Sequence, residues 1–78
     1  MSIEKRVKEV ISKVLNLEED TIVNTLSTGD VEQWDSVGNL NLIEELQKEF
    51  DVQIPFEDLF DLTTVQDFIN EIKKLKNE

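Results

Sequence analysis

The stretch EQWDSVGNLNLIEEL, residues 32–46, places Ser36 directly after Asp35 at the point where an apolar helical pattern begins. Apolar side chains then recur every three or four residues, which predicts an amphipathic helix from Ser36 to about Phe50. Aspartate and serine are both favoured helix caps, so the pair alone indicates only where the helix starts. The predicted buried stripe comprises Val37, Leu40, Ile43, Leu46 and Phe50, with Leu42 beside it.

The segment before this helix divides into a shorter helix and a long loop. Residues 2–15 have apolar side chains at helical intervals, with Ser2 as the predicted cap and Asn16 as the stop. Residues 17–35 lose this period, and a structureless loop of such length is uncommon unless its own side chains fix it. One short helical turn fits inside the loop. We expect Trp34 to be a semi-buried anchor, with direct contact to a partner as the alternative. The residues expected to pin the loop are Leu17, Ile22, Leu26, Val31 and Trp34.

The segment after Phe50 predicts two more helical elements. The segment DVQIP, residues 51–55, ends the preceding helix, because Pro55 pushes Ile54 out of the helical conformation. The pattern of residues 56–62 predicts one or two helical turns. Residues 63–78 predict a last helix, with an apolar side formed by Val65, Phe68, Ile69, Ile72 and Leu75. The spacing of a capping box occurs at Thr63 with Gln66 and, more loosely, at Thr64 with Asp67. The residues that compete for burial in the short helix are Phe56, Leu59, Phe60 and Leu62.

Together these segments predict one all-α domain spanning residues 1–78. We expect a small four-helix bundle, with three longer helices, one short helix and a long ordered loop between the first and second helices. A chain of 78 residues builds only a modest core and has no room for a deep cleft behind it. Cysteine and histidine are both absent, which removes the usual nucleophile, general base and zinc ligands. We therefore predict that the chain is not an enzyme.

Charge and hydropathy narrow the class of partner. Eighteen acidic and eight basic side chains give a formal charge of -10, which repels nucleic acids and anionic membranes and favours basic protein surfaces. No apolar run approaches the length of a membrane span, and the amphipathic start MSIEKRVKEV does not resemble a signal peptide. We expect a cytoplasmic monomer.

A calcium-binding loop starting at Asp30 does not fit the sequence, because Trp34 falls on a ligand position. No metal site is therefore predicted.

The stretch DSVGNLNLIEELQKEFDVQIPFEDLFDLTTVQDFI, residues 35–69, resembles the acyl carrier proteins from their modified serine to their last helix. The attachment motif of that family, Asp-Ser-Leu, is matched by Asp35-Ser36-Val37, and EEL, EFDVQIP, Glu57-Asp58 and LTTVQ follow in the order and spacing of the family. The preceding helix and loop also fit, so the resemblance covers nearly the whole chain.

The resemblance implies that the Ser36 hydroxyl carries 4′-phosphopantetheine, derived from coenzyme A, whose thiol holds acyl or aminoacyl groups as thioesters. A helix start suits this attachment, because its unpaired N–H groups and the positive end of the peptide dipoles favour a phosphate. A separate phosphopantetheinyl transferase would perform the modification, with Asp35 as a polar contact for it or simply as a cap. The chain would then shuttle its cargo between biosynthetic enzymes.

The second helix and the short helix would form the docking surface for the transferase and for acyl- or aminoacyl-handling enzymes with basic patches. Core side chains could also part to admit an acyl chain, although ordinary packing explains them equally well. The predicted docking residues are Val37, Asn41, Glu44, Glu45, Glu49, Glu57, Asp58 and Asp61. The candidates for an acyl cavity are Leu42, Leu46, Ile54, Leu59 and Leu62.

Some positions depart from the usual pattern of the family. Gly38 and Asn41 stand where carriers of fatty acid synthesis often have acidic residues, and Lys48 interrupts the acidic run. Gly38 also lowers helix propensity by roughly 1 kcal/mol. These departures favour a specialised carrier over a housekeeping one. The alternative function is an acidic helical adaptor that is never modified.

Overall fold

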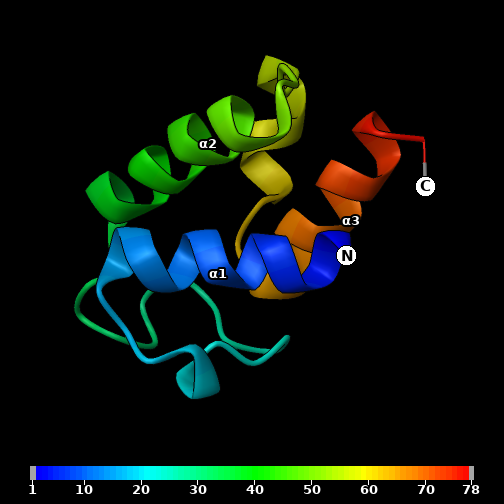
Figure 1. Cartoon of the computed structure of the whole chain (residues 1–78). Coiled ribbons are helices and arrows are strands. Elements are labelled where there is room, and N and C mark those ends of the chain that lie inside the picture. Colours follow the sequence, from blue (N-terminus) through cyan, green and yellow to red (C-terminus); the bar gives the residue numbers. More distant parts are fainter. Residues whose placement is uncertain (1, 78) are drawn as a thin grey trace.

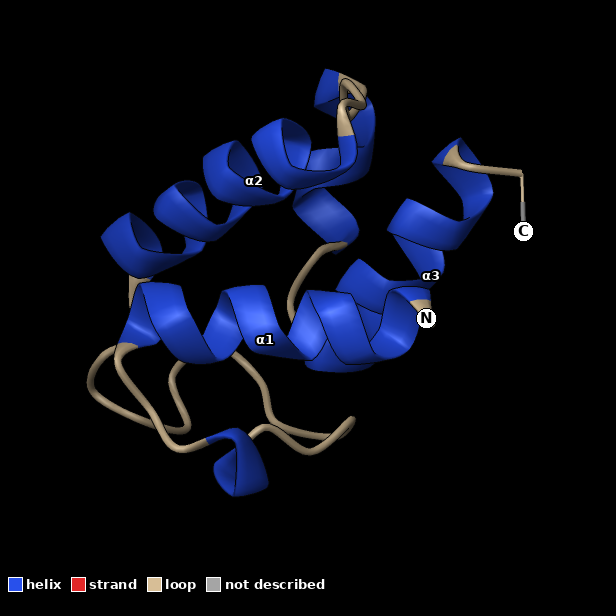
Figure 2. Ribbon diagram, in the orientation of Figure 1, coloured by secondary structure: helices blue, strands red, loops and turns tan. Residues whose placement is uncertain are grey.

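A computed structural model describes residues 2–77 and shows a small helical bundle (Figure 1). Its elements are α1 (Ile3–Leu15), η1 (Glu19–Thr21), α2 (Ser36–Phe50), η2 (Phe56–Asp61) and α3 (Val65–Leu75), where η denotes a 3₁₀-helix. The expected all-α class is confirmed, with three longer helices, the short helix η2 and a long loop between α1 and α2 (Figure 2). Within residues 2–77 the only β-type pairing is an isolated bridge between Ser27 and Thr64. Glu78, the end of the predicted last helical segment, lies outside the described residues.

The ends of the two longer N-terminal helices follow the sequence signals. The Ser2 hydroxyl accepts a hydrogen bond from the Lys5 N–H at 3.1 Å, and Asn16 ends α1 in the left-handed conformation with φ of 57°. α2 begins at Ser36 and ends at Phe50, as predicted. No helix within residues 2–77 has both the length and the apolar character needed to cross a membrane.

The three α-helices pack around a single core. α1 lies between α2 and the long loop in the view of Figure 1, and α3 crosses behind its N-terminal half. The Arg6 guanidinium on α1 lies 4.4 Å from the centre of the Phe50 ring and pairs with Glu49 at 3.3 Å, which ties α1 to the end of α2. The buried apolar residues are Ile3, Val7, Ile11, Leu15, Ile22, Trp34, Leu42, Ile43, Leu46, Phe50, Ile54, Leu62, Val65, Phe68, Ile69 and Ile72.

The predicted stripe of α2 is partly wrong. Val37 and Leu40 are 65% and 62% exposed, although the three-residue rhythm assigned both to the core. The buried face instead follows a four-residue rhythm that starts at a glycine, because a close backbone contact holds that glycine against the preceding loop. The buried residues of α2 are Gly38, Leu42, Ile43, Leu46 and Phe50.

The long loop is fixed by its own apolar side chains, as predicted. Ile22 and Trp34 are buried, and the partly buried Leu17, Leu26 and Val31 pack against the core. Backbone hydrogen bonds also attach the loop to the start of α3: the Val65 N–H donates to the Leu26 carbonyl at 2.9 Å, and the Thr28 N–H donates to the Thr63 carbonyl at 2.9 Å. The single turn η1 is the short helical turn for which the loop has room.

In η2 the aliphatic residues, and not the aromatic ones, take the inner positions. Leu62 is buried and Leu59 is half-buried, whereas Phe56 and Phe60 are 72% and 73% exposed. Of the four residues expected to compete for burial, both phenylalanines are therefore exposed to solvent. A 3₁₀-helix has three residues per turn, so Leu59 and Leu62 share the side that faces the core and Phe60 lies off that side. This period does not explain the exposure of Phe56, which is the first residue of η2.

Candidate functional site

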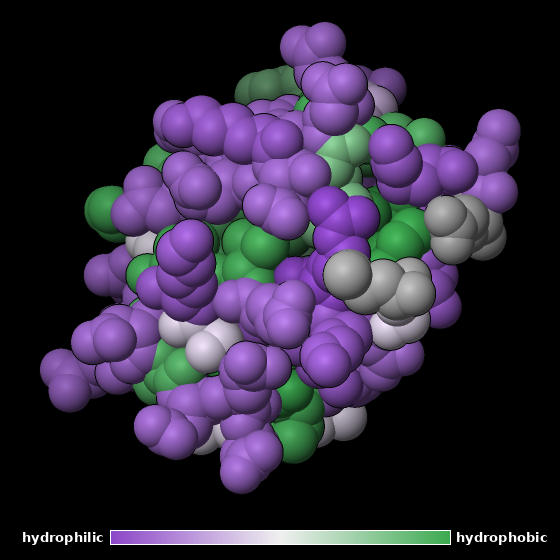
Figure 3. Space-filling view, viewed as in Figure 1, coloured by the Kyte–Doolittle hydropathy of each residue, from purple (hydrophilic) through white to green (hydrophobic). Residues whose placement is uncertain are grey.

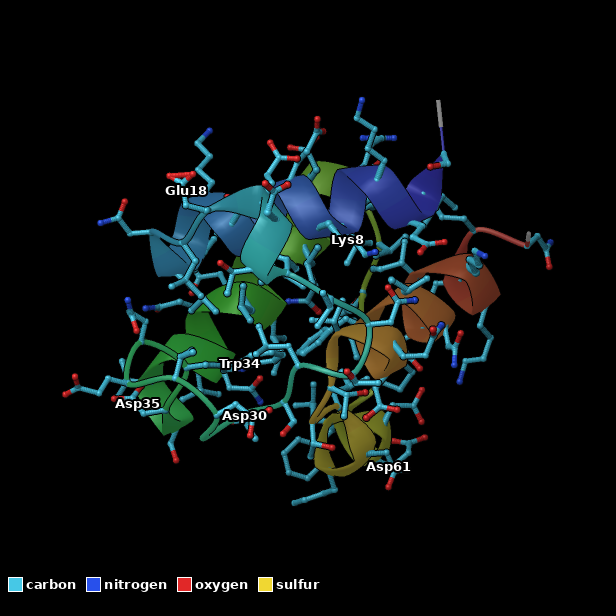
Figure 4. The ribbon with its side chains drawn as sticks, turned by 90° about the horizontal axis from the view of Figure 1, so that it is seen from below. Lys8, Glu18, Asp30, Trp34, Asp35 and Asp61 are labelled. Atoms are coloured by element: carbon cyan, nitrogen blue, oxygen red, sulfur yellow. The ribbon has the colours of Figure 1, made fainter. Side chains whose placement is uncertain are left out.

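The loop before Ser36 is anchored from below by a tryptophan. Trp34 is completely buried, 6.2 Å from the Phe68 ring, and its Nε1–H donates to the Asn39 Oδ1 at 2.8 Å. Its carbonyl accepts hydrogen bonds from the Gly29 N–H at 2.8 Å and the Thr28 hydroxyl at 3.0 Å. The anchoring role is confirmed, but the expected partial exposure is wrong, and full burial rules out direct contact with a partner. In Figure 4 Trp34 lies nearer the middle of the molecule than its neighbour Asp35.

Asp35 and Gly38 shape the first turn of α2. The Asp35 Oδ1 accepts a hydrogen bond from the Gly38 N–H at 2.8 Å, so Asp35 is the N-cap of the helix. A Cβ at position 38 would collide with the Gln33 carbonyl oxygen. Gly38 lowers helix propensity, as expected, but it also has a structural role. The loop can pass this close to α2 only because glycine has no side chain.

Asn39 is a structural residue of the site that the sequence patterns do not single out. It accepts the hydrogen bond from Trp34, and its Nδ2 donates to the Leu62 carbonyl at 3.4 Å. One side chain therefore joins the first turn of α2, the loop beneath it and the end of η2. Its position next to the buried face of an amphipathic helix is the one sequence feature that indicates a structural role. That feature does not identify its hydrogen-bond partners, Trp34 and Leu62.

Ser36 is exposed at the first position of α2, and its hydroxyl makes no hydrogen bond to another residue within 2–77. This distinguishes it from the other serines of the chain, whose side chains bond internally. The Ser2 Oγ accepts from the Lys5 N–H, the Ser12 Oγ donates to the Leu17 carbonyl, and the Ser27 Oγ donates to the Asp30 carboxylate at 3.2 Å. Ser36 is thus the serine whose hydroxyl is both exposed and uncommitted.

The electrostatics of this helix start suit an attached anion. The N-cap Asp35 accepts from the Gly38 N–H, but no acidic residue follows it in the first turn of α2, and the N–H groups of Ser36 and Val37 have no acceptor within residues 2–77. The first N–H groups of a helix carry its positive partial charge, so they stabilise a nearby phosphate. A hydroxyl at this position can therefore carry a phosphodiester without losing an internal contact.

The predicted docking residues of α2 are exposed on one helix and differ in their ion pairs. Val37 and Asn41 are free of such contacts, whereas Lys48 lies 3.6 Å from carboxylate oxygens of both Glu44 and Glu45. Glu49 forms the pair with Arg6 described above. Figure 3 shows that the face containing α1 and α2 is mainly hydrophilic, with small apolar areas in the seam between the helices. Internal pairing therefore reduces the negative charge that α2 offers.

The predicted docking residues of η2 separate into two groups. Glu57 and Asp61 are exposed, whereas Asp58 is half-buried and accepts a hydrogen bond from the Lys74 ammonium at 2.9 Å. Lys74 also lies 3.5 Å from Glu71, so it connects η2 to α3. The Lys74 ammonium lowers the pKa of Asp58, while burial and the nearby Asp58 raise the pKa of Glu71. Asp58 thus has a structural contact that Glu57 and Asp61 lack.

The predicted cavity residues lie in the core. Leu42, Leu46, Ile54 and Leu62 are buried, and Leu59 is half-buried against the same core. Two surface depressions lie elsewhere, one at Gln47 and residues 51–53 and the other between α1 and the end of α2. An acyl cavity between these leucines and Ile54 therefore stays a prediction. Within residues 2–77 no three Asp or Glu side chains converge as metal ligands.

A family model and a curated relative relate the chain to the same family. Residues 5–72 match the family model described as the phosphopantetheine attachment site. The chain is 40% identical over 76 residues to an acyl carrier protein of Buchnera aphidicola subsp. Schizaphis graminum, covering 94% of this chain and 96% of that protein.

Two solved structures share the fold. A Mycobacterium tuberculosis structure described as that of an acyl carrier protein has a TM-score of 0.82 at 27% identity, covering 94% of this chain and 97% of the other. The solution structure of a holo acyl carrier protein from Geobacter metallireducens has a TM-score of 0.86 at 21% identity, covering 99% and 88%. The second likeness bears on the fold alone.

Proposed function

Because this chain belongs to the acyl carrier protein family, we propose that Ser36 is the residue to which its prosthetic group is attached. Members of this family are carriers and not enzymes, and they bear a covalently attached 4′-phosphopantetheine group that holds acyl cargo as a thioester. The chain is such a carrier, and the unmodified adaptor is not favoured. The position of the attachment and the identity of the partners are the subject of the proposal.

One observation carries the assignment to Ser36. Among the serines of residues 2–77, only Ser36 combines an exposed side chain with a hydroxyl that bonds to no other described residue. A transferase must reach the hydroxyl oxygen and bond it to phosphorus, so an exposed and unpaired oxygen is the first requirement. Transfer at Ser12 or Ser27 would instead break a hydrogen bond that fixes the loop.

The surrounding residues hold the attachment point in place. Asp35 caps the helix through Gly38, so the N–H groups of Ser36 and Val37 remain directed towards an attached phosphodiester. Trp34 and Asn39 fix the loop and the first turn to the core beneath. We propose that these contacts keep the hydroxyl outward while the cargo arm moves freely.

The partners are proposed from charge and exposure. A phosphopantetheinyl transferase and acyl- or aminoacyl-handling enzymes would approach α2 and η2 with basic surfaces, because electrostatic contacts speed encounter and still allow release. Since coenzyme A and such enzymes meet in the cytosol, we propose that the carrier acts there. The uncharged Gly38 and Asn41 support a specialised pathway over housekeeping fatty acid synthesis.

The test is incubation of the purified chain with coenzyme A, Mg²⁺ and a broad-specificity phosphopantetheinyl transferase, followed by intact-mass measurement. We expect the wild-type chain to gain one phosphopantetheine and Ser36→Ala to gain none. Ser27→Ala is the matched control, because Ser27 lies in the same loop region but is hydrogen bonded to Asp30, and it should be modified normally. Modification of Ser36→Ala, or none in the wild type under conditions that modify another carrier, would refute the proposal.

A further inference from the structure

We propose that Phe56 and Phe60 on η2 form an aromatic anchor that inserts into an apolar pocket, bordered by Lys or Arg, on an enzyme that acts at Ser36. This inference rests on the proposed function and adds a docking element to it. The acidic contacts discussed above are shared by many surfaces of the chain, whereas two adjacent exposed aromatic rings occur in residues 2–77 only here.

The two rings form a defined pair and are not loose core residues. Their centroids are 5.4 Å apart and their planes are nearly perpendicular, at 88°, which is a favourable edge-to-face arrangement. Both side chains are more than 70% exposed. The pair therefore presents a preformed apolar surface that ordinary core packing of η2 does not use.

Other side chains in and directly after η2 hold this segment in place. Leu59 and Leu62 pack towards the core, and Asp58 is bonded to Lys74 of α3 at 2.9 Å. η2 is thus fixed from behind by apolar contact and by an ion pair. A fixed aromatic anchor loses little conformational entropy when a partner binds, and aromatic side chains of this kind dominate many interfaces.

Charge identifies the kind of partner. Residues 14–62 contain thirteen acidic side chains and a single basic one, Lys48, which is paired with Glu44 and Glu45. Glu57 is exposed and lies three residues before Phe60, on the same side of the 3₁₀-helix. A complementary pocket therefore needs cationic residues at its border. A second copy of this chain would instead place acidic side chains against one another, and an anionic membrane would be repelled.

The residue that follows η2 contacts the helix turn that carries the attachment site. The Leu62 carbonyl, at the end of η2, accepts a hydrogen bond from Asn39, which lies one helical turn after Ser36. The C-cap residue of η2 thus contacts the first turn of α2. An enzyme that reaches the Ser36 hydroxyl can therefore extend over the adjoining helix and bind the two rings.

The experiment measures steady-state transfer by the broad-specificity transferase to full-length wild-type chain and to the double variant Phe56→Ala/Phe60→Ala. We expect KM to rise about tenfold or more with little change in kcat, because the rings contribute binding and not chemistry. Val23→Ala is the control, since Val23 is also exposed, at 50%, but lies in the long loop away from η2. Glu57→Gln should raise KM less, and its effect should fall at high salt. Circular dichroism checks that every variant is folded.

The outcomes are distinguishable. An unchanged kcat/KM in the folded double variant overturns the aromatic anchor while the carrier function stands, whereas no transfer to the wild type removes both. Sedimentation equilibrium tests a second copy: a wild-type dimer that the double variant converts to monomer would assign the rings to self-association. Binding of the wild type, but not of the variant, to neutral phosphatidylcholine vesicles would assign them to lipid. Either result would overturn the proposal.

Discussion

The first N–H groups of α3 all have acceptors, whereas those of Ser36 and Val37 at the start of α2 have none within residues 2–77. The Val65 and Gln66 N–H groups of α3 donate to the Leu26 and Asn24 carbonyls of the long loop at 2.9 and 3.0 Å. In α3 the Thr64 hydroxyl accepts from the Asp67 N–H at 3.0 Å, and the Asp67 Oδ2 accepts from the Thr63 and Thr64 N–H groups at 3.2 and 3.0 Å. In α2 the only cap is the bond from the Gly38 N–H to Asp35. The Asp35 carboxylate therefore accepts from one N–H group of the first turn of α2, and the N–H groups of Ser36 and Val37 are left for an external anion.

The two helix starts also differ in what supports them. The start of α3 is held by its caps and by backbone hydrogen bonds to the long loop, while the start of α2 is held by the buried Trp34 and by the close approach of the loop to Gly38. Changes beneath α2 should therefore cost more stability than removal of a cap at α3. The following predictions test that ranking.

Trp34→Ala should have the largest effect on stability. Removing this completely buried ring leaves a cavity next to Phe68, so we expect a loss of about 3–5 kcal/mol in the free energy of unfolding. Urea unfolding followed by circular dichroism measures it. Trp34→Phe is the matched control, because it retains an aromatic ring but loses the bond to Asn39, and it should lose about 1–3 kcal/mol. A loss below about 1 kcal/mol for Trp34→Ala would show that the loop does not hold the start of α2.

Gly38→Ala should have the next largest effect. The added methyl group meets the Gln33 carbonyl, so we expect a loss of about 1–3 kcal/mol despite the better helix propensity of alanine. Asn41→Ala on the exposed side of α2 controls for propensity and should not destabilise the chain. Should Gly38→Ala prove as stable as the wild type in urea, the close contact with the loop would have no energetic importance.

Thr64→Ala removes the cap of α3 and should cost about 1 kcal/mol, because one N–H group at the helix start loses its acceptor. Thermal unfolding monitored by circular dichroism is a sufficient measurement. Transfer to Ser36 should be unaffected, since the change lies at the other helix start. A loss larger than that of Trp34→Ala would reverse the proposed ranking.

The smallest effect should be the pH dependence contributed by Asp67. Burial raises the pKa of Asp67, but hydrogen bonds from Thr63 and Thr64 outweigh it, so the pKa lies below the ordinary value of 3.8. A lowered pKa in the folded state stabilises the fold above pH 3.8, and this contribution is lost as pH falls through the folded-state pKa. Asp67→Asn should therefore be less stable than the wild type at pH 7, with a difference that shrinks as the solution is acidified. If the difference in the free energy of unfolding stayed constant from pH 7 to below pH 3.8, the lowered pKa of Asp67 would be contradicted.

The sequence predicts much of the fold because several of its signals are local. The bounds of α2, the cap at Ser2 and the stop at Asn16 follow from residue preferences that act within one or two turns. At α3 the looser of the two capping pairs, Thr64 with Asp67, is the one that forms. Thr63 instead joins the same network through its N–H and hydroxyl groups, which both bond to Asp67.

The errors concern burial set by distant parts of the chain. Val37 and Leu40 satisfy the helical period, but the loop packs at Gly38, where no hydrophobic signal exists. The full burial of Trp34 depends on Phe68 and Asn39, which come from two different helices. The exposure of Phe56 and Phe60 likewise cannot be predicted from the local sequence, because a phenylalanine in a helical segment is normally assigned to the core. The aspartate–serine pair at Asp35 and Ser36 needed the wider resemblance before it indicated more than a cap.

The central claim is that the prosthetic group is attached to Ser36, and its most direct test is to locate the modification after transfer. Trypsin should release residues 14–48 as one peptide, which contains both Ser27 and Ser36. Fragmentation mass spectrometry of that peptide should place the phosphopantetheine on Ser36 alone. A modification located on Ser27, or on a peptide containing Ser2 or Ser12, would contradict the account.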